Sequence, residues 1–289
     1  MNKIPVLALA AVLAISVFTL IGCGQSKGQV SDRGSMGGTC VSTIDVGKGD
    51  CILLQSGDSA ALIDTGYEKT AGDVLSYLNE RGVSHLDFVV LTHYDRDHVE
   101  GLREIGKKLD IGTVYLPGYE GSDKNYRIAI SAVEDLGLKS QKVTEQLHLK
   151  LGDNDLEVYP SSVEYVPGTK GEEGNDNDMS LVATLTGSDA SYLFAGDLEA
   201  EGIDAFLKRG LGHFDVLKMP HHGKKSSGTE KLLESVKPNV AIITDSEDDP
   251  AEKKTLKELD AIGADVYRTS KSGTFAVRSN GAGGYTVSE

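Results

Sequence analysis

A nearly continuous apolar run at residues 86–91 leads directly into four potential metal ligands. The run, Leu-Asp-Phe-Val-Val-Leu, is typical of a strand that is covered on both faces. His93, Asp95, Asp97 and His98 follow within six positions, in a chain with only seven histidines. Taken singly, each histidine is more often a hydrogen-bonded polar residue than a ligand. A tight turn at a strand end lets alternate side chains converge, and imidazole and carboxylate are common donors for zinc, manganese and iron. Four donors from one segment favour a centre with two ions.

Strand and helix patterns alternate on both sides of this cluster. Strands are predicted at residues 41–46, 51–55, 60–63, 86–91, 113–116, 156–159, 181–185, 191–194, 216–219, 240–243, 266–268 and 274–277. Helices are predicted at residues 70–82, 127–136, 199–209, 230–236 and 251–262, and the main internal loop at 161–178. Buried strands interleaved with helices in both halves predict an α/β fold of two packed sheets with helices outside, a four-layer αββα sandwich.

The N-terminal segment has a different character. Lys3 supplies an early positive charge, residues 4–21 are almost wholly apolar, and Leu-Ile-Gly-Cys ends at Cys23. This pattern resembles a bacterial lipoprotein signal peptide, which is cleaved before a lipid-modified cysteine; an uncleaved membrane helix is the alternative. We expect a signal peptide at 1–22, lipidated Cys23 with a flexible tether to residue 38, and a folded domain at 39–289. The expected location is the bacterial cell envelope, lipid-anchored and extracytoplasmic.

Cys40 and Cys51 are predicted to be reduced and buried. If residues 41–46 and 51–55 form a hairpin, Cys40 lies at its far end and Cys51 beside the turn. That places them roughly 20 Å apart, against the ~6 Å that a disulfide needs.

The charge balance limits the surfaces that could bind a polyanion. The chain carries 44 acidic and 29 basic residues, for a net charge of −15. An anionic surface repels nucleic acid, so a phosphate-containing substrate would need a local site, with metal as the natural source of positive charge.

Five motifs together resemble one protein family. His93-Tyr94-Asp95-Arg96-Asp97-His98 is similar to the His-x-His-x-Asp-His signature of the metallo-β-lactamase fold, with Asp95 in place of the second histidine. That replacement occurs in the extracytoplasmic nuclease-like domain of ComEC-type competence proteins. The other segments that match this subgroup, in the same order, are 45–50 with 62–66, 177–182, 194–197 and 215–223. The resemblance covers residues 39–277.

The resemblance implies a set of ligands. One metal would be held by His93 and Asp95, and the second by Asp97 and His98 with a histidine of the pair at 221–222. Asp197 would bridge both ions, although a turn residue after a strand is its plainer interpretation.

The resemblance also implies roles for the histidine pair and its neighbours. Adjacent residues of an extended segment point to opposite sides, so we expect His222 to be the ligand and His221 to contact substrate or transfer a proton. Asp97 and His221 are the expected catalytic residues. Asp45 and Asp64 are expected to hydrogen-bond loops near the site rather than to bind metal.

Substrate contacts are expected from five residues near the proposed ligands. No histidine stands in the third motif, where Asn177 and Ser180 occur instead. Lys224 replaces the serine that usually follows His-His-Gly, and Lys225 and Ser227 follow it. These five residues are the predicted substrate-binding set.

The function implied is that of a metal-dependent envelope hydrolase. Two divalent ions, zinc or manganese, would lower the pKa of a shared water and aim the bridging hydroxide at phosphorus or carbonyl. Asp95 adds a hard oxygen donor, which makes manganese as reasonable as zinc and favours a phosphodiesterase or nuclease. The expected partners are a phosphodiester substrate, with DNA as one candidate, and the membrane through Cys23; no protein partner is indicated. Alternatives are an ester or amide hydrolase of the lactonase or β-lactamase kind, and a non-catalytic surface-binding lipoprotein.

Overall fold

A computed structural model describes residues 38–168, 174–187, 189–279 and 283–289. The predicted signal peptide, the lipidation site Cys23 and the tether up to residue 37 lie outside the described residues. Among the residues that are described, no helix is both long enough and apolar enough to cross a membrane.

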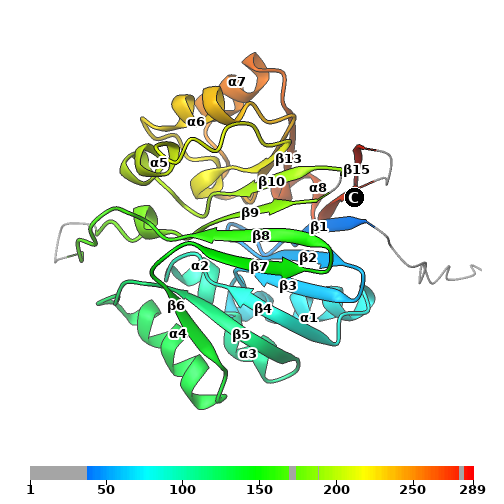
Figure 1. The fold of residues 1–289 in the computed structure, drawn as a ribbon, viewed down its shortest axis with the longest axis vertical. Helices are drawn as coiled ribbons and strands as arrows, with labels where there is room; N and C mark the ends of the chain where they lie inside the picture. The colour runs from blue at the N-terminus through cyan, green and yellow to red at the C-terminus, as the bar shows by residue number, and fades with distance from the viewer. Residues whose placement is uncertain (1–37, 169–173, 188, 280–282) are drawn as a thin grey trace, which may run out of the picture. The chain divides into compact units, whose positions relative to one another are not determined.

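Two mixed sheets form the centre of the fold (Figure 1). The eight-stranded sheet has the order β15-β14-β1-β2-β3-β4-β5-β6. Its strands are β1 Thr39–Thr43, β2 Ile52–Ser56, β3 Ser59–Ile63, β4 His85–Val90, β5 Asp110–Pro117, β6 Ser140–Val143, β14 Phe275–Ser279 and β15 Tyr285–Ser288. The seven-stranded sheet has the order β13-β12-β11-β10-β9-β8-β7. Its strands are β7 Leu147–Leu151, β8 Asn154–Tyr159, β9 Val182–Thr186, β10 Ser191–Phe194, β11 Val216–Lys218, β12 Val240–Ile243 and β13 Asp265–Arg268.

Helices cover the outer face of each sheet. The described helices are α1 Ala71–Glu80, α2 Arg96–Val99, α3 Leu102–Gly106, α4 Lys124–Asp135, α5 Ala200–Leu207, α6 Thr229–Val236, α7 Lys253–Ala261 and α8 Thr269–Ser272, with short 3-10 turns at Glu68–Thr70, Asn177–Met179 and Pro220–Gly223. Figure 1 shows α1, α3 and α4 beside the first sheet and α5, α6 and α7 beside the second.

The period of two in the strands sorts side chains into three apolar layers. In β4, Val89 packs with the helices outside the first sheet, whereas Val90 packs between the two sheets. In β11, Val216 faces between the sheets and Leu217 faces α5 and α6. Because both strands are apolar on both faces, each needs a layer on each side. The four-layer αββα sandwich is therefore confirmed.

The strands that the sequence did not reveal lie mainly at sheet edges. β6, β7 and β15 were not predicted, and each is the last strand of its sheet. Their residues are largely exposed or half-buried, so the apolar signal is weak. The first strand was predicted to extend to residue 46, but it ends at Thr43 because the chain then turns into the loop that carries Asp50. Cys40 and Cys51 are buried and free, as predicted.

One edge of the fold collects the ends of several strands. β3 and β4 run parallel in the first sheet, and β10, β11 and β12 run parallel in the second, so their carboxyl ends meet at this edge. Backbone bonds join the loops that follow: Thr65 donates its N–H to the carbonyl of His98 at 2.7 Å, and Gly101 donates to that of Gly66 at 2.9 Å.

Gly101 allows these loops to approach closely. A Cβ placed on Gly101 would lie 2.1 Å from the carbonyl oxygen of Thr65, far inside van der Waals contact. The residue has an ordinary helical φ of −68°, so close packing rather than backbone conformation requires glycine here.

We expect Gly101→Ala to lower the free energy of unfolding by about 1–3 kcal/mol, because the added methyl must displace backbone. Gly72→Ala is the matched control: Gly72 is exposed in α1 with open space around it, so alanine there should stabilise by up to about 1 kcal/mol. Urea unfolding of both variants measures the difference. Equal midpoints for the two variants would contradict the tight contact at Gly101.

Candidate metal centre

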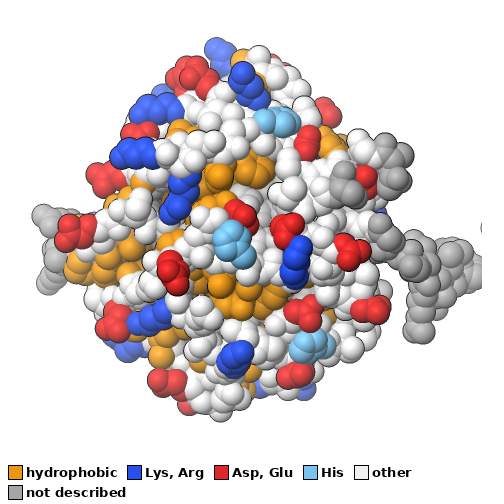
Figure 2. Space-filling model, in the orientation of Figure 1, with side chains coloured by type: hydrophobic (Ala, Val, Ile, Leu, Met, Phe, Trp, Pro, Cys, Tyr) orange, Lys and Arg blue, Asp and Glu red, His pale blue; other side chains and the backbone are white. Residues whose placement is uncertain are grey.

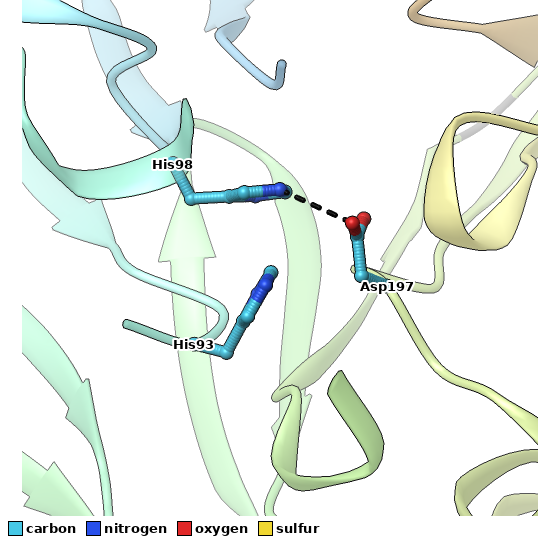
Figure 3. Close-up of side chains that lie close together, drawn as sticks. All are labelled: His93, His98 and Asp197. Atoms are coloured by element: carbon cyan, nitrogen blue, oxygen red, sulfur yellow. Dashed lines mark ion pairs between the residues drawn. The ribbon is translucent and has the colours of Figure 1, made fainter. Parts of the chain in front are cut away.

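Three buried imidazole rings present one unpaired nitrogen each. Nε2 of His93, His98 and His222 is buried and has no hydrogen-bond partner within the described part of the chain. The ring centroids of His93 and His98 are 4.1 Å apart, and those of His98 and His222 are 5.3 Å apart. Figure 3 shows His93 and His98 directed toward the space in front of Asp197. Since leaving buried polar atoms unpaired is costly, three such atoms gathered together indicate a site for a ligand.

Carboxylates face the same space. Oδ2 of Asp197 lies 2.9 Å from Nε2 of His222 and 3.4 Å from Nε2 of His98. Oδ2 of Asp97 lies 3.4 Å from Nε2 of His222. Three groups in the described part of the chain have ligand atoms close enough to share one metal ion, and two of them consist of predicted ligands: His93, His98 and Asp197, and Asp97, His98 and His222. Five of the six predicted ligands therefore meet at one point.

Asp95 lies beside its predicted partner His93 but is more exposed than the other predicted ligands. Its carboxylate lies 3.6 Å from Nε2 of His93, but its side chain is 44% exposed and it joins neither of these groups. The group that contains His93 is completed by His98 and Asp197. Asp95 is the N-cap residue of α2 and has an extended backbone, with φ of −68° and ψ of 149°.

Each ring is held from behind through its other nitrogen. Nδ1 of His98 lies 2.8 Å from Oδ2 of Asp64, and Nδ1 of His93 lies 3.1 Å from the hydroxyl of Thr92. Nδ1 of His222 lies 3.0 Å from the hydroxyl of Thr244. Bonds of this kind fix the orientation of an imidazole and leave Nε2 to a metal.

The two aspartates expected to hold loops do so. Asp64 accepts hydrogen bonds from the backbone N–H and the hydroxyl of Thr92, both at 2.7 Å. Asp45 accepts one from the N–H of Gly47 at 2.9 Å.

Burial and opposite charges shift the pKa values of this cluster in opposite directions. Burial lowers the pKa of His98, but the carboxylates of Asp197 and Asp64 outweigh it and hold that pKa well above the usual value. For His222, burial again lowers the pKa, and Asp197 and Asp97 raise it overall. Burial raises the pKa of Asp197, yet His222, His98 and Lys218 hold it well below the usual range. The carboxylates and imidazoles therefore shift one another's pKa values in the directions that favour their charged forms.

Lys218 and Asp50 belong to this centre although no role was predicted for either. The ammonium nitrogen of Lys218 lies 2.5 Å from Oδ2 of Asp50 and 3.3 Å from Oδ1 of Asp197, and its side chain is fully buried. A lysine inside the apolar run at 216–219, just before the histidine pair, was the signal in the sequence.

The histidine pair reaches its places through an unexpected backbone. His221 and His222 both have left-handed conformations, with φ/ψ of 46°/48° and 51°/30°, so the extended segment that was predicted is wrong. This turn buries His222 among the metal-binding groups and leaves His221 half-buried, with Nδ1 3.0 Å from Oε1 of Glu199. Left-handed non-glycine residues are unfavourable and concentrate at functional sites.

Asn177 and Ser180 support the centre from behind. The amide of Asn177 donates to Oε1 of Glu199 at 3.2 Å. Ser180 is fully buried, and its hydroxyl accepts a hydrogen bond from the backbone N–H of Asp197 at 3.1 Å. Ser180 is thus engaged within the protein, whereas Oδ1 of Asn177 has no hydrogen-bond partner among the described residues.

An open cleft of about 390 Å³ lies beside the centre. It is lined by Leu198, Glu199, Ala200, His221, Lys224, Lys225, Ser226 and Glu252. Ser227, predicted to bind substrate, is exposed and does not line it; Ser226 does.

The two lysines of the cleft are not free charges. Lys224 forms an ion pair with Asp249, and Lys225 pairs with Glu258 at 2.8 Å. On the face drawn in Figure 2, basic and acidic side chains are interspersed. Positive charge at this rim is therefore largely balanced.

Comparison with known proteins agrees with this architecture. The model of the Metallo-beta-lactamase superfamily matches residues 44–243. Recombination protein 2 of Haemophilus influenzae is 30% identical over 245 residues, which are 82% of this chain and 28% of that protein. Competence protein ComA of Neisseria gonorrhoeae is 27% identical over 208 residues, 71% of this chain and 26% of that protein. The chain thus spans less than a third of the length of these relatives.

A solved structure gives the same fold. The metallo-beta-lactamase fold protein YhfI from Bacillus subtilis superposes with a TM-score of 0.53 at 13% identity, covering 82% of this chain and 99% of that one. The predicted resemblance to competence proteins of this fold is confirmed. The chain belongs to the metallo-beta-lactamase superfamily.

Proposed function

We propose that the chain is a metal-dependent phosphodiesterase that acts outside the cytoplasm. The observation that carries this proposal is the meeting of three unpaired Nε2 atoms with the carboxylates of Asp97 and Asp197. The superfamily and the competence-protein relatives support a hydrolase whose substrates include DNA. Cleavage after residue 22, lipidation of Cys23 and anchoring of a hydrolase domain at 39–289 complete the proposal.

The residues present suit two divalent ions, zinc or manganese. His93, His98 and Asp197 would serve one position and Asp97, His98 and His222 the other, with Asp95 at the rim. His98 belongs to both groups but can bind only one ion through Nε2. Asp197, which lies near both His98 and His222, would be the ligand that the two ions share. Bound ions would supply an acidified water and neutralise the phosphate oxygens.

His221 is placed to transfer a proton. Its Nδ1 is fixed by Glu199, which Asn177 holds in turn, so the ring has a set orientation along the cleft. The remaining nitrogen, Nε2, would donate to the leaving oxygen. Because Lys224 and Lys225 are already paired, the charge of the substrate would be met at the metal centre, which favours a short phosphodiester or a nucleic-acid end over a long duplex.

Removing the carboxylate of Asp197 should weaken metal binding strongly. We expect the wild type to bind two Mn²⁺ or Zn²⁺ ions, and Asp197→Ala to bind at least about 100-fold more weakly, since it removes the shared carboxylate. Asp204→Ala is the matched control, because Asp204 is a surface acid of α5 paired with Lys231. Isothermal titration calorimetry and metal analysis give affinity and stoichiometry. Unchanged binding by Asp197→Ala would refute the ligand set.

Metal affinity should fall as the pH is lowered. Neighbouring carboxylates raise the pKa values of His98 and His222, so protons compete with an incoming ion for both imidazoles. The apparent affinity should drop by about tenfold per pH unit for each proton released. Calorimetry in buffers of different ionisation enthalpy counts these protons; a titration that releases none contradicts this assignment.

Substrate class can be decided with three compounds. We expect hydrolysis of bis-p-nitrophenyl phosphate and single-stranded DNA, loss of activity with chelator, and at least a 100-fold lower rate in Asp97→Ala. Nitrocefin should not be cleaved. Cleavage of nitrocefin alone would replace the phosphodiesterase by a lactam hydrolase, and metal binding without any hydrolysis would favour a binding protein.

A further inference from the structure

Lys218 is a buried charge in a strand that is otherwise apolar. It ends β11, next to Val216 and Leu217, which are both fully buried. Placing an ammonium group in such surroundings is costly unless strong partners surround it. An apolar side chain at this position would pack at lower cost.

Its partners are groups of the metal centre. The ammonium nitrogen lies 2.5 Å from Oδ2 of Asp50, 3.3 Å from Oδ1 of Asp197 and 3.0 Å from the carbonyl oxygen of Gly196. Three oxygens satisfy the three N–H bonds of an ammonium group. Burial lowers the pKa of Lys218, but Asp50 and Asp197 outweigh it, so the group stays charged.

These contacts divide the two oxygens of Asp197 between different partners. Oδ1 faces Lys218, whereas Oδ2 faces Nε2 of His222 at 2.9 Å and Nε2 of His98 at 3.4 Å. A carboxylate without this tie could rotate and offer either oxygen or both. With Oδ1 held, the carboxylate plane is set and Oδ2 is directed at the imidazoles.

Lys218 is also linked, through Asp50 and Thr244, to a second proposed ligand, His222. The hydroxyl of Thr244 donates to Oδ1 of Asp50 at 2.6 Å, and Nδ1 of His222 lies 3.0 Å from that hydroxyl. The position of His222 and the orientation of Asp197 are therefore set by one buried network.

Asp50, Asp64 and His98 also have atoms spaced closely enough for a metal ion. Lys218 and Thr244 already contact the two oxygens of Asp50, and His98 and Thr92 those of Asp64. The ammonium group of Lys218 thus supplies positive charge beside Asp50, where a metal ion would otherwise supply it.

From these contacts we propose that Lys218 is a positioning residue, which holds Oδ1 of Asp197 so that Oδ2 alone is offered to the metal ions. The inference rests on the proposed metal centre. Lys218 sets the orientation of the Asp197 carboxylate and does not contact the reacting atoms.

The test compares four variants of the full chain loaded with Co²⁺, whose visible absorption reports ligand geometry. Lys218→Met removes the tie and should change the Co²⁺ spectrum, lower kcat at least tenfold and leave KM within about threefold. Lys218→Arg keeps the positive charge, so its Co²⁺ spectrum and its kcat should both lie closer to those of the wild type than the values for Lys218→Met. Lys231→Met, at a surface ion pair with Asp204, is the control and should match the wild type.

The double variant Asp50→Asn/Lys218→Met separates positioning from simple stability. It removes both partners of the buried pair, so urea unfolding should be closer to wild type than for Lys218→Met. The altered Co²⁺ spectrum should persist, because Asp197 is still untied. A wild-type spectrum in Lys218→Met or in the double variant overturns the inference. A wild-type protein that binds no Co²⁺ overturns the proposed function and this inference with it.

Discussion

The carboxylate of Asp64 ties together the ends of two parallel strands, and the rest of the centre depends on that tie. Asp64 follows β3, and its oxygens bind the backbone and hydroxyl of Thr92, directly beyond β4, as well as Nδ1 of His98. It has a left-handed φ of 57°, which turns the carboxylate back across the strand ends. The turn that carries the histidines is thus fixed before any metal is bound, and the cost of orienting the rings is met during folding.

The sequence predicted the elements whose burial leaves a strong apolar pattern. The strands β4 and β11 were identified because both faces are covered. β6 and β7 were missed because an edge strand with half-exposed side chains has no such pattern. The short helix α2 has one turn, too few residues for a period of 3.6 to be visible.

Within the centre, residue types were more predictable than backbone and contacts. The spacing of His93, Asp97 and His98 indicated a common site, and the structure brings them together. The left-handed turn at His221 and His222 could not be read from local sequence, since both residues usually avoid it and only the surrounding loops impose it. Lys224 was predicted to bind substrate, and its ion pair with Asp249 was not anticipated because Asp249 lies far along the chain.

Residues from both sheets form the proposed metal centre. His93 and His98 follow β4 of the first sheet, whereas Asp197 and His222 follow β10 and β11 of the second. An ion bound between them would crosslink the halves of the sandwich, and binding of this kind stabilises only the folded state. Supply of metal would therefore set resistance to proteolysis as well as catalytic competence, so that chains left without metal would be the first to be degraded.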